Sequence, residues 1–270
     1  MSRPDQRAPA WISGGSSGIG LEVARQLAGR GHPVVLMARN ADRLDEAAAR
    51  IMKDEPAASV LGIPVDVTDR AALGTAVDQA VAAHGAPGIV VASAGLVEPG
   101  LFLEQSIAVH EAQLAVNYKG TLNLIHAAAP LMRDAGGGQI ALVSSGAAFF
   151  GVYGYGAYAP SKFAVRALAE VLRVELAPHG IVVTLCYPPD TETPMLEAEM
   201  RTKPEATKVI SAGGGLWQPD AVARALLRGM DKGRFAVTPG WQMAALYWIA
   251  PLIWPVMRWH QGRVVRRLAP

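Results

Sequence analysis

Tyr158 and Lys162 are four residues apart, in Tyr158-Ala159-Pro160-Ser161-Lys162 ahead of a stretch with helical spacing. Residues four apart share one helix face, so the phenol and the ammonium are predicted to project into the same cavity. A free tyrosine has a pKa near ~10, and a neighbouring ammonium group favours the phenolate and lowers that pKa. The spacing therefore predicts a proton donor or acceptor that works at neutral pH.

Polar residues that could assist this pair precede it in the chain. Ser145 ends an apolar segment in the Ser144-Ser145-Gly146 turn, where its hydroxyl could hydrogen-bond a substrate carbonyl. Ser144 is the alternative for this role, because the sequence does not decide which of the two adjacent serines faces the substrate. Asn117, in Val116-Asn117-Tyr118, could hold a water against Lys162.

A glycine-rich segment near the N-terminus indicates a phosphate cradle. It follows the first apolar run and opens the first helix-patterned stretch, where backbone N–H groups can approach a pyrophosphate. A glycine-rich turn without a ligand is the alternative. The candidate cofactor-binding residues are Gly14, Ser16, Ser17, Gly18, Ile19 and Gly20.

The end of the second apolar run favours NADP over NAD. An acidic residue there would bind the ribose hydroxyls of NAD, but Arg39 stands there, with Arg43 one helical turn further on. A guanidinium group suits a 2′-phosphate, although both arginines could simply be solvated. Asp66 and Val67, after the third run, are predicted to touch the adenine edge.

These residues need a scaffold that alternates strands and helices. Short apolar runs, typical of strands buried on both faces, alternate with segments of helical spacing, which predicts a doubly wound parallel α/β sheet with helices on both faces. The predicted strands are Ala10–Ser13, Pro33–Ala38, Val60–Val65, Gly88–Ser93, Gln139–Ser144, Ile181–Cys186 and Arg234–Val237. The predicted helices are Gly20–Arg30, Asn40–Asp54, Arg70–His84 and Lys162–Ala177.

The chain is predicted to hold one catalytic domain and a separate tail. Residues 1–240 form the domain, including a long polar substrate loop at 190–217, and residues 241–270 form an apolar tail. A loop of that length inside a compact domain is usually a lid or a binding loop.

Composition excludes several other classes of protein. The chain has 270 residues, 51% of them hydrophobic, which excludes intrinsic disorder, and its net charge of +2 makes nucleic acid an unexpected partner. Cys186 is the single cysteine, so no internal disulfide or multi-cysteine metal site is possible, and no metal ligands are proposed. Met1 to Trp11 carry Arg3 and Arg7 without an apolar signal-peptide core, so we expect a cytoplasmic protein.

Taken together, the glycine cradle, Asn117, Ser145 and Tyr158-x-x-x-Lys162 resemble the short-chain dehydrogenase/reductase family. The resemblance spans residues 10 to 240 and implies a seven-stranded Rossmann fold. It also implies that Tyr158 is the acid/base, that Lys162 binds the nicotinamide ribose, that Ser145 orients the carbonyl and that Asn117 supports a proton-relay water. By the same resemblance, Gly95 and the loop residues Pro188, Thr191 and Thr193 contact the cofactor.

One segment departs from the pattern of that family. Relatives carry Asn-Asn-Ala-Gly after the fourth strand, whereas this chain has Ala92-Ser93-Ala94-Gly95. The missing amide removes a hydrogen bond that tethers a strand. Because Gly95 keeps the close backbone approach, we expect cofactor binding to survive.

The segment Pro188-Pro189-Asp190-Thr191-Glu192-Thr193-Pro194 resembles, more narrowly, the 3-ketodihydrosphingosine reductases. That resemblance implies an NADPH-dependent reduction of a long-chain, lipid-like amino ketone. Asp190 and Glu192 could pair with the 2-ammonium group of such a substrate, or could serve only in loop capping and solvation. The other hypotheses are a 3-oxoacyl thioester reductase, a hydroxysteroid dehydrogenase, and a regulatory protein that binds NADP without catalysis.

The tail offers a lipid contact. Residues 241–257 are almost wholly apolar with tryptophans at intervals, and four arginines follow before residue 268. A span needs about 20 apolar residues, and two internal prolines interrupt these, so a peripheral contact through 241–267 at the cytoplasmic face of a membrane is predicted instead. The alternatives are a flap over the active site and an oligomer contact. The family resemblance also implies a homo-oligomer, a dimer or a tetramer.

Overall fold

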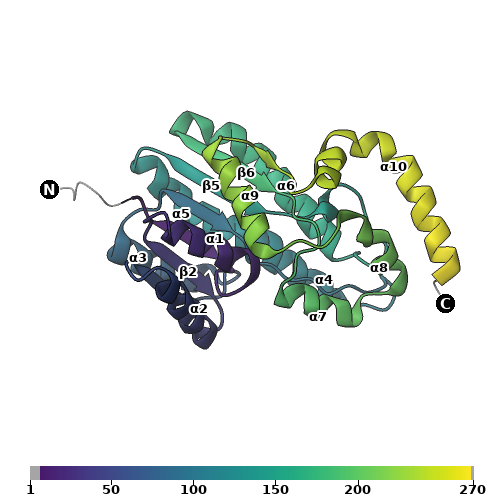
Figure 1. Ribbon diagram of the computed structural model, residues 1–270, viewed down its shortest axis with the longest axis horizontal. Coiled ribbons are helices and arrows are strands. Elements are labelled where there is room, and N and C mark those ends of the chain that lie inside the picture. The colour runs from purple at the N-terminus through teal and green to yellow at the C-terminus, as the bar shows by residue number, and fades with distance from the viewer. Residues whose placement is uncertain (1–6, 269–270) are drawn as a thin grey trace.

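The computed structural model describes residues 7–268, so Arg3 and the last two residues of the tail lie outside the described part. Seven parallel strands form one sheet in the order β3-β2-β1-β4-β5-β6-β7 (Figure 1). The predicted seven-stranded, doubly wound fold is therefore confirmed. The strands are β1 (Ala10–Ser13), β2 (Val34–Ala38), β3 (Val60–Pro64), β4 (Ile89–Ala92), β5 (Gly138–Val143), β6 (Ile181–Cys186) and β7 (Ala236–Val237).

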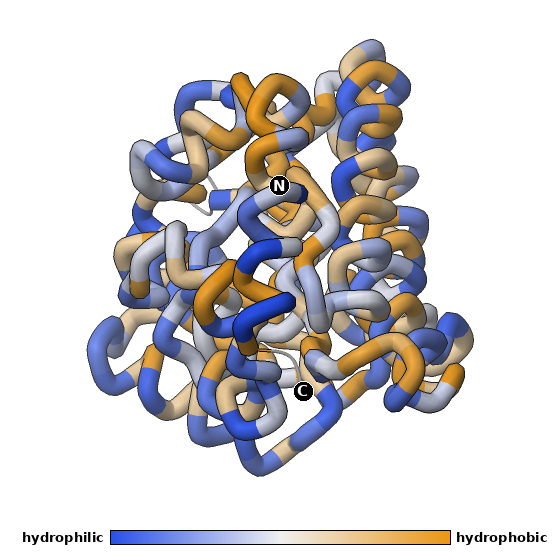
Figure 2. Tube along the Cα trace, turned by 90° about the vertical axis from the view of Figure 1, so that its right-hand side faces the viewer, coloured by the Kyte–Doolittle hydropathy of each residue, from blue (hydrophilic) through white to orange (hydrophobic). Residues whose placement is uncertain are grey.

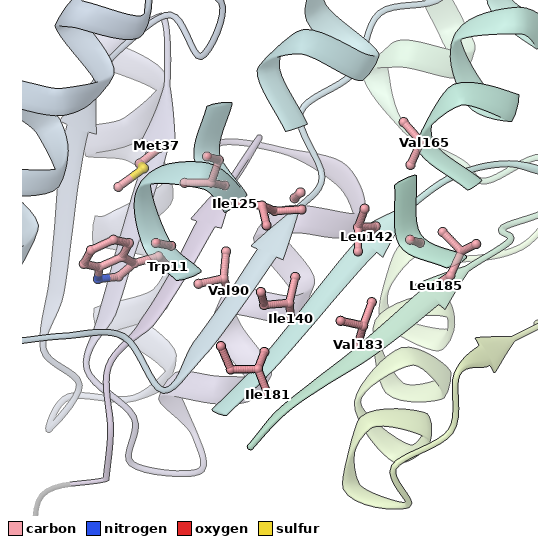
Figure 3. Packing of buried hydrophobic residues seen from close by; sticks show 14 of the residues in the cluster. Trp11, Met37, Val90, Ile125, Ile140, Leu142, Val165, Ile181, Val183 and Leu185 are labelled. Carbon is pink, nitrogen blue, oxygen red and sulfur yellow. The ribbon is translucent and has the colours of Figure 1, made fainter. Parts of the chain in front are cut away.

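Two apolar cores sandwich this sheet, because successive side chains of a strand point to opposite faces. Trp11 of β1 lies in one core with Val90 and Ile140 of the neighbouring strands (Figure 3). Ile12, the next residue, lies in the other core. This burial on both faces explains why the strands read as continuous apolar runs.

Helices cover both faces of the sheet (Figure 1). The helices that supply one core are α1 (Gly18–Ala28), α2 (Ala41–Asp54) and α9 (Pro219–Asp231). Those that supply the other are α3 (Arg70–His84), α5 (Gly120–Asp134) and α6 (Tyr158–Glu175). Alternation of strand and helix brings the carboxyl ends of the strands to one edge, where ligands of such sheets bind.

Short elements connect the chain at that edge. Helix α4 (Ile107–Leu114) continues through a π-helical turn, Ala115–Lys119, into α5. Single 3₁₀ turns occupy Gly146–Ala148 and Ala212–Gly214, and a third, Ala177–His179, leads into β6 at the opposite edge.

The prediction of a long loop at 190–217 is wrong for most of its length. The segment holds α7 (Pro194–Thr202) and α8 (Glu205–Ser211). Thr193 caps α7 by accepting a hydrogen bond from the Leu196 N–H at 3.3 Å, and proline suits the first helical position. The cap and the proline are local helix signals, whereas the polar composition of the segment favours a loop.

The tail forms α10 (Trp241–Leu268), which contains both Pro251 and Pro255. Figure 1 shows α10 changing direction between its first turns and the arm that runs down to the C-terminus. Proline removes a helical hydrogen bond and crowds the preceding turn, which accounts for the bend. Val264, near the end of this arm, packs on Ala206 and Ile210 of α8. No helix within residues 7–268 combines the length and apolar character that a membrane span needs.

Candidate active site

A cavity of about 800 Å³ opens at the carboxyl ends of the strands. Its wall begins at the glycine turn after β1, passes the ends of β4, β5 and β6, and continues to α7, α8 and α10. Most of the predicted site residues line it. They are Gly14, Ser16, Ser17, Gly18, Ile19, Arg39, Arg43, Asp66, Val67, Gly95, Ser144, Ser145, Tyr158, Lys162, Pro188, Thr191 and Thr193.

The glycine turn brings the backbone of β1 into direct contact with the end of β4. Gly14 has a φ of +69°, and a Cβ atom there would lie 2.8 Å from the Ala94 nitrogen. Gly20 does not line the cavity; a Cβ atom there would meet the Gly14 carbonyl oxygen at 2.4 Å, so this glycine allows α1 to pack on the turn. Ser17 starts α1 without a side-chain cap, and the first turn carries no acidic residue. These features leave N–H groups and a positive helix end facing the cavity, which suits a pyrophosphate.

Basic and acidic groups flank that turn. Arg39 and Arg43 are exposed at the cavity edge, and neither forms a salt bridge with a carboxylate in the described part of the chain. Burial by itself would raise the pKa of Asp66, but its hydrogen bonds with Thr68 and the charge of Arg39 outweigh burial and lower that pKa. Free guanidinium groups at this place suit a phosphate on the ribose.

Ser13 links the ends of β1 and β4, although Ala92–Gly95 lacks the asparagine side chain that relatives use for this link. Its hydroxyl oxygen accepts hydrogen bonds from the N–H groups of Ser93 at 3.2 Å and Ala94 at 3.3 Å. The ends of β1 and β4 are therefore joined by a serine in place of an amide. Sequence reasoning missed this role, because Ser13 and Ser93 are far apart along the chain.

Tyr158 begins α6, and Lys162 follows one turn later, so both face the cavity as the spacing predicted. The Lys162 ammonium lies 5.7 Å from the centre of the Tyr158 ring and donates a hydrogen bond to the Val143 carbonyl at 3.1 Å. Burial lowers the pKa of Lys162 to about 8.

The pKa of Tyr158 differs from the expectation of a lowered value. Burial raises this pKa above its ordinary value, and the hydrogen bond with Ser145 offsets only part of that increase. The charges of Glu199 and Asp190 raise it further. The ammonium of Lys162 is directed at a backbone carbonyl and does not reverse the effect of burial on the phenol.

The two serines of the β5 end have different partners. Ser145 acts on Tyr158 by lowering the pKa of the phenol, and its hydroxyl accepts from the Ala147 N–H at 3.1 Å. Ser144 donates to the backbone carbonyl of Lys162 at 3.0 Å, which ties the strand end to α6. Ser145 is therefore the candidate that acts beside the Tyr158 phenol, whereas Ser144 holds α6 in position.

Asn117 lies fully buried behind the cavity wall in the π-helical turn. Its amide oxygen accepts from the Leu96 N–H at 2.7 Å, and its amide nitrogen donates to the Leu96 carbonyl at 2.9 Å and to Ser161 Oγ at 2.8 Å. The side chain thus braces the segment after β4 against α6. The amide oxygen accepts one hydrogen bond and can accept a second, so the relay water near Lys162 stays a prediction.

The segment after β6 lies against the glycine turn. A Cβ atom at Gly18 would lie 2.9 Å from Thr193 Cγ2, and Thr191 is anchored by its hydroxyl, which donates to the Pro189 carbonyl at 2.9 Å. Asp190 lines the cavity, whereas the exposed Glu192 is turned to Gln218 and does not. Asp190 and Glu192, which the sequence offered together as partners of a substrate ammonium group, therefore have different surroundings.

Glu199 and Lys203 were missed by the sequence reading. Both belong to the α7 region, both are buried, and Glu199 lines the cavity. The Lys203 ammonium lies 2.9 Å from the Glu199 carboxylate and 3.5 Å from that of Asp190. Their spacing of four residues is the signal that could have indicated this pair.

Helix α10 completes the cavity with an apolar wall. Met243 packs beside the β5 end, where a Cβ atom at Gly146 would lie 3.0 Å from its sulfur. Leu246, Ile253 and Met257 also line the cavity. Part of α10 therefore belongs to the cavity wall, and its role as a flap stays a prediction.

Comparison with known proteins agrees with this architecture. The short chain dehydrogenase family model matches residues 9–204. A 3-dehydrosphinganine reductase of Danio rerio is 37% identical over 243 residues, which cover 87% of this chain and 73% of the relative. A 3-ketodihydrosphingosine reductase of Bos taurus is 36% identical over 227 residues, covering 83% and 68%.

Solved structures share the fold. A short-chain dehydrogenase from Sphingobium yanoikuyae in complex with NADPH is 29% identical, with a TM-score of 0.78 over 93% of this chain and 96% of that one. Levodione reductase, at 24% identity, has a TM-score of 0.81 over 89% and 99%. The resemblance drawn from the sequence is confirmed, and the chain belongs to the short-chain dehydrogenase family.

Proposed function

We propose that this protein reduces the 3-keto group of 3-ketodihydrosphingosine to a hydroxyl group with NADPH, giving sphinganine. The observation that carries the proposal is a single cavity that joins the glycine turn, Tyr158 and the apolar wall of α10. Such a cavity has room for a nucleotide, a reacting ketone and part of an alkyl chain. The names of the similar Danio rerio and Bos taurus reductases support this substrate class.

The residues at the glycine turn fit NADPH. The lack of a Cβ atom at Gly14 and Gly18 lets the turn pack against Ala94 and Thr193. The uncapped start of α1 suits the pyrophosphate, and Arg39 with Arg43 suits the 2′-phosphate. The NADPH complex of the Sphingobium yanoikuyae relative supports the same cofactor. When bound, NADPH supplies the hydride that the carbonyl carbon receives.

Tyr158 is the proton donor in this proposal. Because its pKa lies above the ordinary value, its phenol is protonated at neutral pH and can give that proton to the ketone oxygen as the carbon–oxygen double bond becomes single. Ser145 lines the cavity together with this phenol and can hold the ketone oxygen in reach. Lys162, with a pKa of about 8, is mostly charged at neutral pH and stabilises negative charge that develops on the phenol.

A substrate assay tests the proposal. Purified protein is incubated with NADPH and 3-ketodihydrosphingosine in mixed micelles, and loss of the reduced-nicotinamide absorbance is followed together with sphinganine formation. Turnover is expected with this ketone and not with a 3-oxoacyl thioester or a 3-ketosteroid. The opposite preference would reject the substrate, and binding of NADPH without turnover of any of the three would favour the non-catalytic regulatory alternative.

We also propose a peripheral contact between α10 and the cytoplasmic face of a membrane. Trp248 is 78% exposed and Leu252 is 79% exposed on this helix. Figure 2, which faces α10, shows hydrophobic turns in its upper part and hydrophilic turns towards the C-terminus. Indole rings suit the headgroup region, and the arginines that follow suit anionic lipid.

Vesicle binding tests this contact on the full chain. The doubly substituted Trp248→Ser, Leu252→Ser protein should co-sediment at least about tenfold less with phosphatidylserine-containing vesicles, since each lost side chain removes about 1.5–3 kcal/mol of transfer free energy. Leu103→Ser is the matched control, because Leu103 is 94% exposed outside α10. Equal binding of all three proteins would reject the membrane role of α10.

We propose in addition that the protein is a homo-oligomer, a dimer or a tetramer. Val171 and Val174 are exposed one turn apart on α6, and this apolar pair supports a contact between copies. Sedimentation velocity should give the mass of two or four chains. A monomer at micromolar concentration would contradict the proposal.

A further inference from the structure

Four polar side chains meet beside Tyr158, and three of them line the cavity. Tyr155 precedes α6, Asp190 follows β6, Glu199 belongs to α7, and Lys203 directly follows α7. The ring of Tyr155 lies 5.4 Å from that of Tyr158, edge to face. The charges of Glu199 and Asp190 also reach the Tyr158 phenol, since both raise its pKa.

The cluster carries an unbalanced negative charge. The Lys203 side chain is 1% exposed and lies closer to Glu199, at 2.9 Å, than to Asp190, at 3.5 Å. Glu199 also accepts a hydrogen bond from the Tyr155 hydroxyl. One cation therefore faces two carboxylates, and Glu199 has the stronger partners.

Asp190 is the carboxylate that remains available. Its side chain is 36% exposed and borders the cavity, and burial raises its pKa although the charge of Lys203 opposes that change. The contact of this residue with Trp217 uses the backbone carbonyl, so within residues 7–268 the carboxylate has Lys203 as its one charged partner. A partly buried carboxylate with only a long contact to a cation is costly unless a second cation approaches.

Ser211 gives an independent indication of a polar ligand. This residue ends α8 and lines the same cavity. Its hydroxyl oxygen is buried and has no hydrogen-bond partner within residues 7–268. An unsatisfied buried hydroxyl is destabilising, and a polar group of a bound molecule would relieve it.

We infer that Asp190, held in place by Lys203 and Glu199, receives the ammonium group of an amino ketone whose carbonyl faces Tyr158. The inference rests on the proposed function and adds the residue that distinguishes an amino ketone from a plain ketone of the same length. Lys203 and Tyr155 are positioning residues, because they act through Glu199 and Asp190. Glu192, which the sequence placed beside Asp190 in this role, does not take part.

The test compares two ketones that differ only in the amine. They are 3-ketodihydrosphingosine and 1-hydroxyoctadecan-3-one, and the readout is the ratio of their kcat/KM values with NADPH. A hydrogen bond to a charged group predicts that the parent protein prefers the amino ketone by about 10- to 100-fold. Asp190→Asn keeps the shape and removes the charge, so the ratio should fall to near one.

Two further variants make the test specific. Glu192→Gln removes a carboxylate from the same segment outside the cavity and should keep the ratio of the parent protein. Glu199→Gln keeps an oxygen that can accept from Tyr155 and removes one negative charge, so it should also lower the ratio. Circular dichroism verifies that each variant is folded. If Asp190→Asn is unfolded, Glu199→Gln tests the inference in its place.

The outcomes separate this inference from the proposed function. Equal rates on the two ketones by the parent protein, or a preference that survives in Asp190→Asn, would overturn the amine site and leave the ketone reductase standing. No reduction of either ketone would overturn both. A ratio that falls in Asp190→Asn and not in Glu192→Gln supports the inference.

Discussion

Replacement of Lys162 by methionine should stabilise the ligand-free protein at neutral pH while it abolishes reduction. The Lys162 ammonium is buried, and burial lowers its pKa from an ordinary 10.5 to about 8. The folded state therefore holds a charge that it disfavours relative to the unfolded chain. Methionine has a similar length and no charge, so it removes this penalty.

The magnitude follows from the pKa difference. A folded pKa of about 8 against 10.5 corresponds to a penalty of about 3 kcal/mol when the pH is below 8. Loss of the hydrogen bond to the Val143 carbonyl destabilises the variant by about 1 kcal/mol. The free energy of unfolding should therefore rise by a net amount of about 2 kcal/mol at pH 7.

The sign of the pH dependence is fixed by the lowered pKa. Between the folded and unfolded pKa values the folded protein loses this proton while the unfolded chain keeps it, so the penalty fades as the pH rises. The advantage of the methionine variant should accordingly shrink by about 2 kcal/mol between pH 7 and pH ~9.5.

Urea unfolding followed by tryptophan fluorescence measures this advantage at both pH values. Lys53→Met, at an exposed lysine of α2, is the matched control and should change stability by less than about 0.5 kcal/mol at either pH. A Lys162→Met protein that is less stable than the parent at pH 7, or whose advantage is the same at both pH values, would refute the reasoning.

Three further substitutions test the rest of the site. Tyr158→Phe should lower kcat by about 10²- to 10⁴-fold and leave NADPH affinity nearly unchanged in a fluorescence titration, and substantial remaining turnover would exclude the phenol as proton donor. Arg39→Asp should raise the KM for NADPH by about 10- to 100-fold and hardly affect NADH, so that equal changes for both would count against the 2′-phosphate contact. Gly14→Ala, which places a Cβ atom 2.8 Å from the Ala94 nitrogen at a φ of +69°, should lower the urea midpoint by an amount worth about 1–3 kcal/mol, and an unchanged midpoint would show that the turn can relax.

The sequence by itself determined the fold and the main chemistry. Apolar runs between helix-patterned segments specify a parallel sheet, because only a strand buried on both faces dispenses with polar alternation. The predicted strand ends agree with the structure to within two residues. Tyr158 and Lys162 share one helix face as a consequence of spacing alone, so no tertiary information was needed to pair them.

Contacts between distant segments were decided only by the tertiary structure. The Ser13 hydroxyl replaces a missing amide 80 residues further along the chain, and the amide of Asn117 joins Leu96 to Ser161. Glu199 lines the cavity because it lies on α7, whereas Glu192, which the sequence singled out, stays outside it.

The pKa of Tyr158 belongs to the same category. Spacing predicts that Lys162 is near the phenol, but burial and the direction of each hydrogen bond decide which way that pKa moves. The periodicity of a sequence predicts which residues are neighbours within one helix or strand. Burial, charge balance and hydrogen-bond partners depend on which other elements pack there, and that is settled only when the whole chain has folded.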